Sequence, residues 1–530
     1  MSSQNIKGKK LWQGAVYLSL AAILIKILSA IYRIPYQNIA GDVGFYVYQQ
    51  IYPIYGVAIM LSTYGFPVII SKLISENAKD RHSIIKNAFF SIAIISFISF
   101  IILYGSAPWL ANVMGDEQLK LPLRTISIIF IIVPLLSVLR GLFQGDGEML
   151  PTAVSQVVEQ FSRVCAILLL TYFFISHGYG PYAAGTGAAL GSIIGGFIGF
   201  LVLLIFYYKH QKNTARGLHD HRLSFTTINQ IIFQGFMICF SSLILIMFQF
   251  VDSLTVLRLL TESGVVIDTA KVAKGVFDRG QPLIQMGTVI TTSFALVVVP
   301  LIAKVSIEGR QDLIQKYSSL AFRISFLVGG AASVGLAVII KPTNIMLFKD
   351  STDSLVLAVM GLAIFFTSIF LTTSAVLHGL NKIHVTVVHV FTGLFVKTIL
   401  NIILIPSYGT LGAAVATVIA CAVCACFNIY TLRKIEALPK LSIRRAGKIS
   451  FSLFAMALGT FYWKKGVYII LDEVTSSRLG NMFIALTSVA VGTVIFFSFI
   501  IATRLFTEEE LEQIPKMRKL AVFMQSKKSK

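Results

Sequence analysis

The sequence has few charged residues for its length. Only 13% of the 530 residues are Asp, Glu, Lys or Arg, whereas 56% are hydrophobic. Soluble domains carry about 25% charged residues. A soluble protein could not bury so much apolar surface, so this composition excludes a soluble domain of this size. It indicates a chain that is solvated by lipid.

Acidic residues are the scarcer of the two charge types. The chain has 24 Asp and Glu against 45 Lys and Arg, which gives a formal net charge of +21. A basic excess can indicate nucleic-acid binding. Membrane proteins also collect Lys and Arg, in their cytoplasmic loops. Because the chain is so apolar, we favour the second interpretation and expect no nucleic-acid partner.

Cysteine is rare, and the common enzyme motifs are missing. Three of the five cysteines (Cys421, Cys424 and Cys426) lie in an apolar run without the second ligand pair that a zinc site needs, so we interpret them as buried thiols. The cluster His219-Asp220-His221 is interpreted as a loop. No GxxxxGK[ST], HExxH or GxSxG pattern occurs. We therefore expect no metal, no cofactor and no enzymatic activity.

Long apolar runs recur along the whole chain, separated by short polar gaps. Each is long enough to cross a hydrocarbon core about 30 Å thick. They predict an all-α integral membrane protein of about fourteen transmembrane helices, and no loop is long enough for a folded soluble domain. We expect the first helix to be retained, not cleaved as a signal peptide. The predicted spans are 11–34, 45–70, 84–107, 121–143, 152–176, 183–207, 227–253, 281–303, 318–340, 354–377, 385–405, 409–432, 447–471 and 480–503.

The distribution of Lys and Arg predicts the orientation in the cell membrane. If the N-terminus is cytoplasmic, the cytoplasmic loops and both tails hold most of the basic residues. The richest segments are then 209–222, 433–448 and 504–530. We expect both termini to be cytoplasmic, with the basic tail 506–530 on the anionic inner leaflet.

An internal repeat divides the chain into related halves. Residues of the two halves match at a constant offset: Gln144 with His378, Thr152 with Thr386, and Arg163 with Lys397. The repeat predicts an N-lobe (1–222, helices 1–6) and a C-lobe (223–440, helices 7–12), related by an axis along the membrane normal. Residues 441–505 form two extra helices, and 506–530 form the tail. Six glycines between Gly185 and Gly199 predict close helix packing.

Basic residues inside the predicted spans are the best candidates for a binding site. A charge at the bilayer centre costs about 3 kcal/mol on insertion scales, so such residues usually face a bundle interior or a watery cavity. We predict that Lys26, Arg33, Arg163 and Lys397 line a cationic cavity between the lobes. Arg323 lies only a few residues into its span, and we expect it to reach the inner surface.

Alternative roles remain open for these residues. Glu159 precedes Arg163 by four residues, a spacing at which the two could neutralise each other and only brace the bundle. Arg33 could extend to the outer headgroups. Asp252, at the outer end of helix 7, could pair with Arg33 or bind a cation. We assign Glu159, Asp252 and Gln144 supporting or ion-coupling roles.

The sign of the predicted cavity restricts its cargo. Fixed cations in a low-dielectric cavity favour anions, and arginine forks suit phosphate oxygens. A pyrophosphate-linked lipid fits, because its tail can stay in the bilayer while its head crosses. Na⁺ and H⁺ both remain open as the coupling ion.

Three sequence stretches resemble a known family. They are Arg140-Gly-Leu-Phe-Gln-Gly with the following residues to Arg163-Val, Lys26 to Pro35 with Tyr52-Pro-Ile-Tyr55, and Gln281 to Pro300. They resemble the polysaccharide-export branch of the MOP flippase superfamily, with its stage V sporulation protein B-like and MurJ-type members.

The resemblance implies a fold and a function. It implies two six-helix lobes that form a V around a cavity opening alternately to each side. Basic residues of helix 1, here Lys26 and Arg33, would hold the lipid pyrophosphate, and the two extra helices would accommodate the prenyl chain. The branch includes flippases for lipid II and for other undecaprenyl-linked saccharides.

Our leading hypothesis is therefore a flippase for an undecaprenyl-pyrophosphate-linked saccharide, with the lipid-linked saccharide, membrane lipids and envelope-synthesis proteins as partners. A multidrug or small-metabolite exporter of the same superfamily is the main alternative, and cationic dyes would distinguish it. A membrane glycosyltransferase would need acidic groups in sizeable outer loops. The adjacent pairs Asp116-Glu117 and Asp472-Glu473 are interpreted as solvated turns. A non-transporting cell-wall scaffold is the fourth hypothesis.

Overall fold

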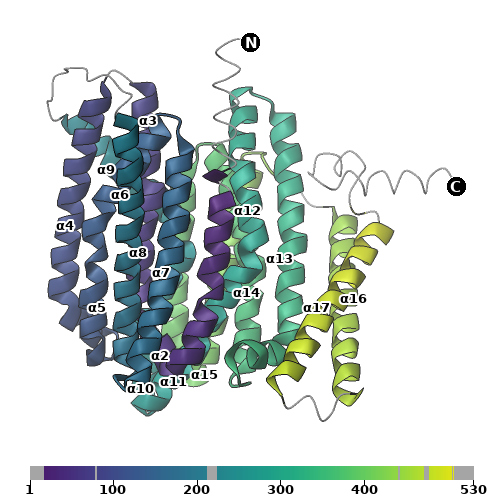
Figure 1. The fold of residues 1–530 in the computed structure, drawn as a ribbon. Helices are drawn as coiled ribbons and strands as arrows, with labels where there is room; N and C mark the ends of the chain where they lie inside the picture. Colours follow the sequence, from purple (N-terminus) through teal and green to yellow (C-terminus); the bar gives the residue numbers. More distant parts are fainter. Residues whose placement is uncertain are drawn as a thin grey trace. The chain divides into compact units, whose positions relative to one another are not determined.

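The computed structural model describes residues 17–18, 20–77, 80–211, 224–439, 442–470, 477–503 and 505, and all regular elements in these ranges are helical. The predicted tail 506–530, the cluster His219–His221 and the pair Asp472-Glu473 lie outside the described residues. Figure 1 shows the helices, most of them long and joined by short connections. Their bounds are α2 (Arg33–Met60), η1 (Leu61–Gly65), α3 (Phe66–Glu76), α4 (Arg81–Val113), η3 (Glu117–Leu119), α5 (Lys120–Ser127), α6 (Ile129–Gly145), α7 (Met149–Ser176), α8 (Gly180–Gln211), α9 (Phe225–Ser242), α10 (Ile244–Glu262), α11 (Ile267–Asp278), α12 (Gly280–Ile307), α13 (Gln311–Phe348), α14 (Ser354–Gly379), α15 (Ile383–Lys434), α16 (Ile443–Ile470) and α17 (Arg478–Ala502).

Eleven helices in the described ranges are long and apolar enough to cross a membrane. Two of them, Leu20–Glu76 and Ile383–Lys434, contain 57 and 52 residues. About 20 residues suffice to span a bilayer, so each of these is long enough for two crossings. Each contains a glycine with non-helical backbone angles, Gly41 and Gly409 respectively. The all-helical membrane fold is thus confirmed, while the number of fourteen crossings stays a prediction.

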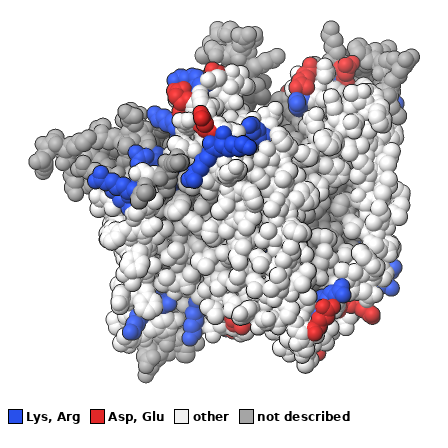
Figure 2. Space-filling view, turned by 180° about the vertical axis from the view of Figure 1, so that it is seen from behind, with Lys and Arg blue, Asp and Glu red and all other residues white. Residues whose placement is uncertain are grey.

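The lipid-facing character is visible on the surface. On the face drawn in Figure 2, charged side chains lie towards the upper and lower ends, and the surface between them is largely uncharged. Large apolar side chains are exposed on single helices, such as Phe97 and Ile101 on α4 and Leu169 on α7. Such surface would be unfavourable in water and is favourable against lipid tails.

The described chain divides into two compact units. Unit 1 contains residues 1–289 and 382–424, and unit 2 contains residues 290–381 and 425–530. The boundaries differ from the predicted division at residue 222, because α9 to α11 belong to the same unit as α2 to α8. The predicted lobes of the repeat stay a prediction.

Within unit 1, small residues bring α7 and α8 close together. Hypothetical Cβ atoms on Gly191, Gly195 and Gly199 of α8 would lie 2.7 Å from the Ile167 backbone nitrogen and 2.5 and 2.9 Å from the Cβ atoms of Arg163 and Glu159. Real Cβ atoms do not approach so closely. The predicted packing role of the glycine-rich stretch is confirmed, and it fixes the helix that carries Arg163.

In unit 2, the last two helices are tied to a bend in α13. Pro342 lies inside α13 and cannot donate to the carbonyl four residues earlier. Lys464 of α16 donates to that carbonyl, on Val338, at 2.6 Å. Arg478 of α17 donates to the Met346 carbonyl in the last turn of α13, at 2.9 Å. These contacts satisfy carbonyls that the bend and the helix end leave open.

Candidate functional site

The bend at Gly41 assembles a cluster of tyrosines. Gly41 has φ of 70°, which places Tyr36 before the bend against Tyr48 after it, with ring centroids 5.0 Å apart. Tyr48, Tyr52 and Tyr55 follow at helical spacing, and their successive ring centroids lie 5.9 and 6.0 Å apart. The "tyrosine cluster" is Tyr32, Tyr36, Tyr48, Tyr52 and Tyr55, all buried.

Arg33, the first residue of α2, is fully buried beside this cluster. Its guanidinium carbon lies 4.1 Å from the ring centroid of Tyr52, a cation–π geometry. None of its three side-chain nitrogens makes a hydrogen bond, and no carboxylate lies within 4 Å, among the described residues. The alternative that Arg33 extends to the outer headgroups is contradicted by this burial.

Arg163 of α7 enters the same cluster and is 1% exposed. One terminal nitrogen donates to the hydroxyl oxygens of Tyr32 and Tyr48, at 2.8 and 2.9 Å. The guanidinium carbon lies 4.0 Å from the ring centroid of Tyr55. None of these partners is a carboxylate, so the two arginines bring two guanidinium groups to one set of tyrosines.

Glu159 does not neutralise Arg163, contrary to the alternative considered from the spacing. Its carboxylate pairs with the guanidinium of Arg140 of α6, which is fully buried. Arg163 instead donates to Gln160 and to Ser192 of α8, at 3.1 and 3.3 Å. Geometry across helices therefore decides the pairing, which the sequence spacing alone could not reveal.

Lys26 lies on the same side of its helix as Arg33. The residues 20–31 are helical, and backbone hydrogen bonds continue through the turn at Tyr32. A separation of seven residues corresponds to about two turns, so Lys26 and Arg33 share a face. Between them, Ser29 accepts a hydrogen bond from Gln160, at 3.2 Å. No ion pair of Lys26 is present in the part of the chain that the structure describes.

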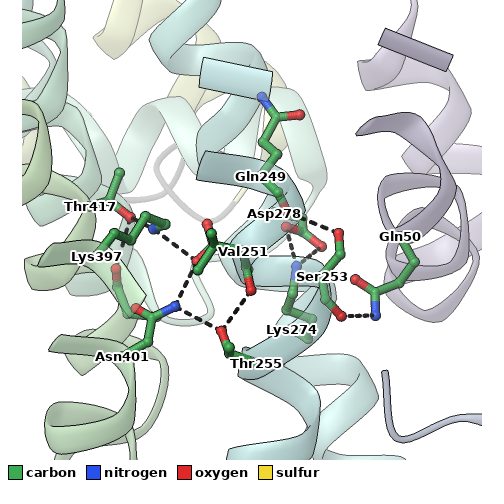
Figure 3. Close-up of polar contacts among 12 residues, drawn as sticks. Gln50, Gln249, Val251, Ser253, Thr255, Lys274, Asp278, Lys397, Asn401 and Thr417 are labelled. Atoms are coloured by element: carbon green, nitrogen blue, oxygen red, sulfur yellow. Dashed lines mark hydrogen bonds and ion pairs between the residues drawn. The ribbon is translucent and has the colours of Figure 1, made fainter. Parts of the chain in front are cut away.

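Lys397 is in a second polar region of unit 1. It is fully buried in α15, and its ammonium group lies 2.8 Å from the Asp252 carboxylate of α10 and 2.6 Å from the Thr417 hydroxyl. Asn401 donates to the same carboxylate, at 3.2 Å. Figure 3 shows Lys397, Asn401 and Thr417 converging from one side. Asp252 thus pairs with Lys397 and not with Arg33.

Two further ion pairs with buried cations adjoin this region. Lys274 donates to Asp278 on α11 at 2.6 Å, and Arg279 donates to Asp42 of α2, with a nitrogen–oxygen distance of 2.7 Å. Figure 3 shows Lys274 and Asp278 near Ser253 of α10, the residue that follows Asp252. The "paired network" is Lys397–Asp252, Lys274–Asp278 and Arg279–Asp42, in which every cation has its own carboxylate.

The other predicted residues lie elsewhere. Gln144 lies in the last turn of α6, where its carbonyl accepts from the Gly147 amide in the connection to α7. Arg323 is 3% exposed in unit 2, so it is buried and does not reach out from its helix as expected.

Sequence reasoning overlooked Arg140 and the tyrosines, although both left signals. Arg140 lies within a predicted span and opens the Arg-Gly-Leu-Phe-Gln-Gly motif. Tyr48, Tyr52 and Tyr55 recur at helical spacing in the predicted span 45–70, which follows the span that holds Lys26 and Arg33. Chemically, the tyrosine cluster with Arg33 and Arg163 is suited to an anion. No group of three or more His, Cys, Asp or Glu side chains in the described ranges could hold a metal.

Comparisons with known proteins place the chain among membrane transporters. A family model described as "Polysaccharide biosynthesis protein" matches residues 11–306. An uncharacterized membrane protein of Bacillus subtilis (strain 168), YabM, is 37% identical over 525 residues, 98% of each chain. From the same organism, the lipid II flippase MurJ is 27% identical over 77% of this chain and 80% of its own. Stage V sporulation protein B is 27% identical over 96% and 98%.

Solved structures share the fold. A structure of the lipid II flippase MurJ in an inward closed conformation has a TM-score of 0.68 and 15% identity, and covers 92% of this chain and 99% of its own. An inward-facing multidrug resistance transporter of the MATE family has a TM-score of 0.65 and 15% identity, and covers 78% and 94%. The family match and the relatives confirm the predicted resemblance to the polysaccharide-export branch, and the solved structures confirm the all-helical membrane fold, whereas the two six-helix lobes and the fourteen crossings stay predictions.

Proposed function

The chain belongs to the polysaccharide biosynthesis protein family of the MOP superfamily, and on this premise we propose that it flips an undecaprenyl-pyrophosphate-linked saccharide across the cell membrane. Alternating access of the fold would carry the polar head across while the prenyl tail remains in lipid. The protein acts as a transporter and not as an enzyme. Lipid II and other polysaccharide precursors belong to this substrate class.

The observation that carries this proposal is the unneutralised charge of Arg33 and Arg163. A buried charge in a membrane span is costly, and a carboxylate is the usual compensation. The tyrosine cluster supplies only ring faces and hydroxyl groups. The pyrophosphate of the substrate supplies the missing negative charge, and arginine forks bind phosphate oxygens in pairs. Lys26, on the same helix face, would contact the same headgroup.

Lys397 receives a different part in this proposal. Its ammonium is engaged by Asp252, so it stabilises the α10–α15 contact instead of binding phosphate. One Asp252 oxygen, Oδ2, makes no hydrogen bond among the described residues. The Asp252–Lys397 pair is our candidate for coupling to a Na⁺ or H⁺ gradient, because breaking it would expose a carboxylate to a cation.

We also propose that both chain ends face the cytoplasm, as the distribution of basic residues predicts. Substrate would then enter from the inner leaflet and leave on the outer leaflet. Envelope-synthesis proteins on either side would supply and consume the lipid-linked saccharide.

Flipping in reconstituted vesicles tests the proposal. We expect purified protein to move fluorescent lipid II between leaflets, and Arg33→Ala and Arg163→Ala each to slow this at least about tenfold, equivalent to about 1.4 kcal/mol. Imposed Na⁺ and pH gradients in the same assay identify the coupling ion. Arg258→Ala is the matched control, because Arg258 is an exposed arginine of α10 paired with Glu262.

Two outcomes would contradict the proposal. One is flipping at the wild-type rate in both arginine variants. The other is transport of cationic dyes without flipping of lipid II, which would support the multidrug-exporter alternative that the MATE-like fold keeps open.

A further inference from the structure

Arg140 is the ion-pair partner of Glu159, the acidic residue one helical turn before Arg163. The guanidinium of Arg140 pairs with the Glu159 carboxylate and donates to the Ser155 hydroxyl of α7, at 3.3 Å. Its other terminal nitrogen donates to the Ser62 carbonyl and the Thr63 hydroxyl, at 3.2 and 3.1 Å. Ser62 and Thr63 belong to the π-helical turn η1. These contacts hold Arg140 between η1 and α7, where its charge is neutralised by Glu159.

Glu159 would otherwise reach Arg163. The two residues are separated by one helical turn, the spacing at which acid–base pairs form on helices. Both face α8, since Gly195 and Gly199 pack against their Cβ atoms. Arg163 lies over the Tyr55 ring, 4.0 Å from its centroid. The Glu159 carboxylate, however, is turned to Arg140 and not to Arg163.

We propose that Arg140 is a positioning residue that keeps Glu159 away from Arg163 and so preserves the positive charge of the anion site. This inference rests on the proposed anion-binding function of the tyrosine cluster. Arg140 would thus raise the affinity of the site for pyrophosphate through Glu159 and Arg163, without contacting the pyrophosphate itself. Without Arg140, Glu159 would pair with Arg163 and cancel the charge that attracts the anion.

The test is binding of farnesyl pyrophosphate, a soluble prenyl pyrophosphate, to the purified full chain in detergent. The variant Arg140→Gln keeps hydrogen-bond donors for Ser62 and Ser155 but removes the charge. We expect it to weaken binding at least about tenfold. Glu159→Gln should bind at least as tightly as the wild type, and Arg140→Gln combined with Glu159→Gln should return to within about threefold of it. Arg140→Lys, which retains a charge for Glu159, should bind like the wild type.

A variant that lacks the Arg163 charge distinguishes a positioning role of Arg140 from simple structural support. In Arg163→Gln, Glu159 has no cation to neutralise. Adding Arg140→Gln should therefore weaken binding by less than about threefold, whereas structural damage would weaken it as much as in the wild-type background. A loss that persists in this background, or a double variant that stays weak, overturns the inference.

Two other results can be interpreted: misfolding of Arg140→Gln, and the absence of farnesyl pyrophosphate binding by the wild type. If Arg140→Gln does not fold, Glu159→Gln alone and Arg140→Lys decide, because a tenfold loss in either contradicts the inference. If the wild type itself binds no farnesyl pyrophosphate, the proposed anion site is contradicted. If the wild type and Arg140→Gln both bind it normally, the anion site stands and the positioning role of Arg140 is contradicted.

Discussion

The tyrosine cluster and the paired network lie in the same unit and treat buried charge in opposite ways. In the network, Lys397, Lys274 and Arg279 each contact a carboxylate at 2.6–2.8 Å. In the cluster, Arg33 and Arg163 contact tyrosine rings and hydroxyl groups. In the paired network each buried cation is neutralised by a carboxylate of the protein, which suits a structural role. In the tyrosine cluster the arginines have no carboxylate partner, which suits ligand binding but lowers the stability of the ligand-free protein.

The largest expected effect is on the network side of this comparison. Lys397→Met would leave Asp252 buried without its cation, which typically costs about 3–5 kcal/mol of unfolding free energy. We expect a large drop in thermal stability, measured by fluorescence in detergent. Combining Lys397→Met with Asp252→Leu should recover most of the loss, because an apolar pair can replace a buried ion pair. A double variant as unstable as the single one would mean that Lys397 is needed for its shape and not for its charge.

The opposite behaviour is expected in the cluster. Arg33→Met removes a buried charge without a counterion, so stability without ligand should stay constant or rise. Farnesyl pyrophosphate at about 100 times its Kd should stabilise the wild type by about 2.7 kcal/mol, and this gain should vanish in the variant. Thermal unfolding with and without ligand measures both effects. If Arg33→Met destabilised the protein as much as Lys397→Met, the two regions would not differ in kind.

Much of the fold could be predicted from the sequence, because the physics of a membrane span is local. A run of apolar residues must form a helix to satisfy its backbone, so α4, α7 and α14 fall where the apolar runs do. The glycines of α8 predicted close helix packing, because small residues let helix backbones approach each other. The breaks at Gly41 and Gly409 were also predictable, because they lie in or directly after the gaps between the predicted spans 11–34 and 45–70 and between 385–405 and 409–432. The η1 turn was not predicted, because it lies inside the predicted span 45–70.

The candidate site was predictable in its charges and not in their partners. Burial of Arg33, Arg163 and Lys397 follows from their place in apolar runs. Whether each meets a carboxylate depends on which helices touch, and this is set by tertiary packing. Glu159 shows the limit: its spacing suggests Arg163, but Arg140 of another helix takes it. The same packing pairs Lys397 with Asp252, which lies 145 positions away in the sequence, a separation that no helical spacing rule predicts.

The smallest expected effect gives the comparison its baseline. Arg258 and Glu262 form an ion pair on α10 with a nitrogen–oxygen distance of 2.8 Å, the same as that of Lys397–Asp252, and on the same helix as Asp252. Their side chains are 53% and 54% exposed, however. Exposed pairs contribute about 0–1 kcal/mol, because water and salt screen them and either partner can be solvated alone. We therefore expect Arg258→Ala to change the unfolding free energy by less than about 1 kcal/mol, in the same thermal assay. A loss near that of Lys397→Met would show that distance alone, and not burial, sets the value of an ion pair in this protein, and the contrast between the two regions would lose its physical basis.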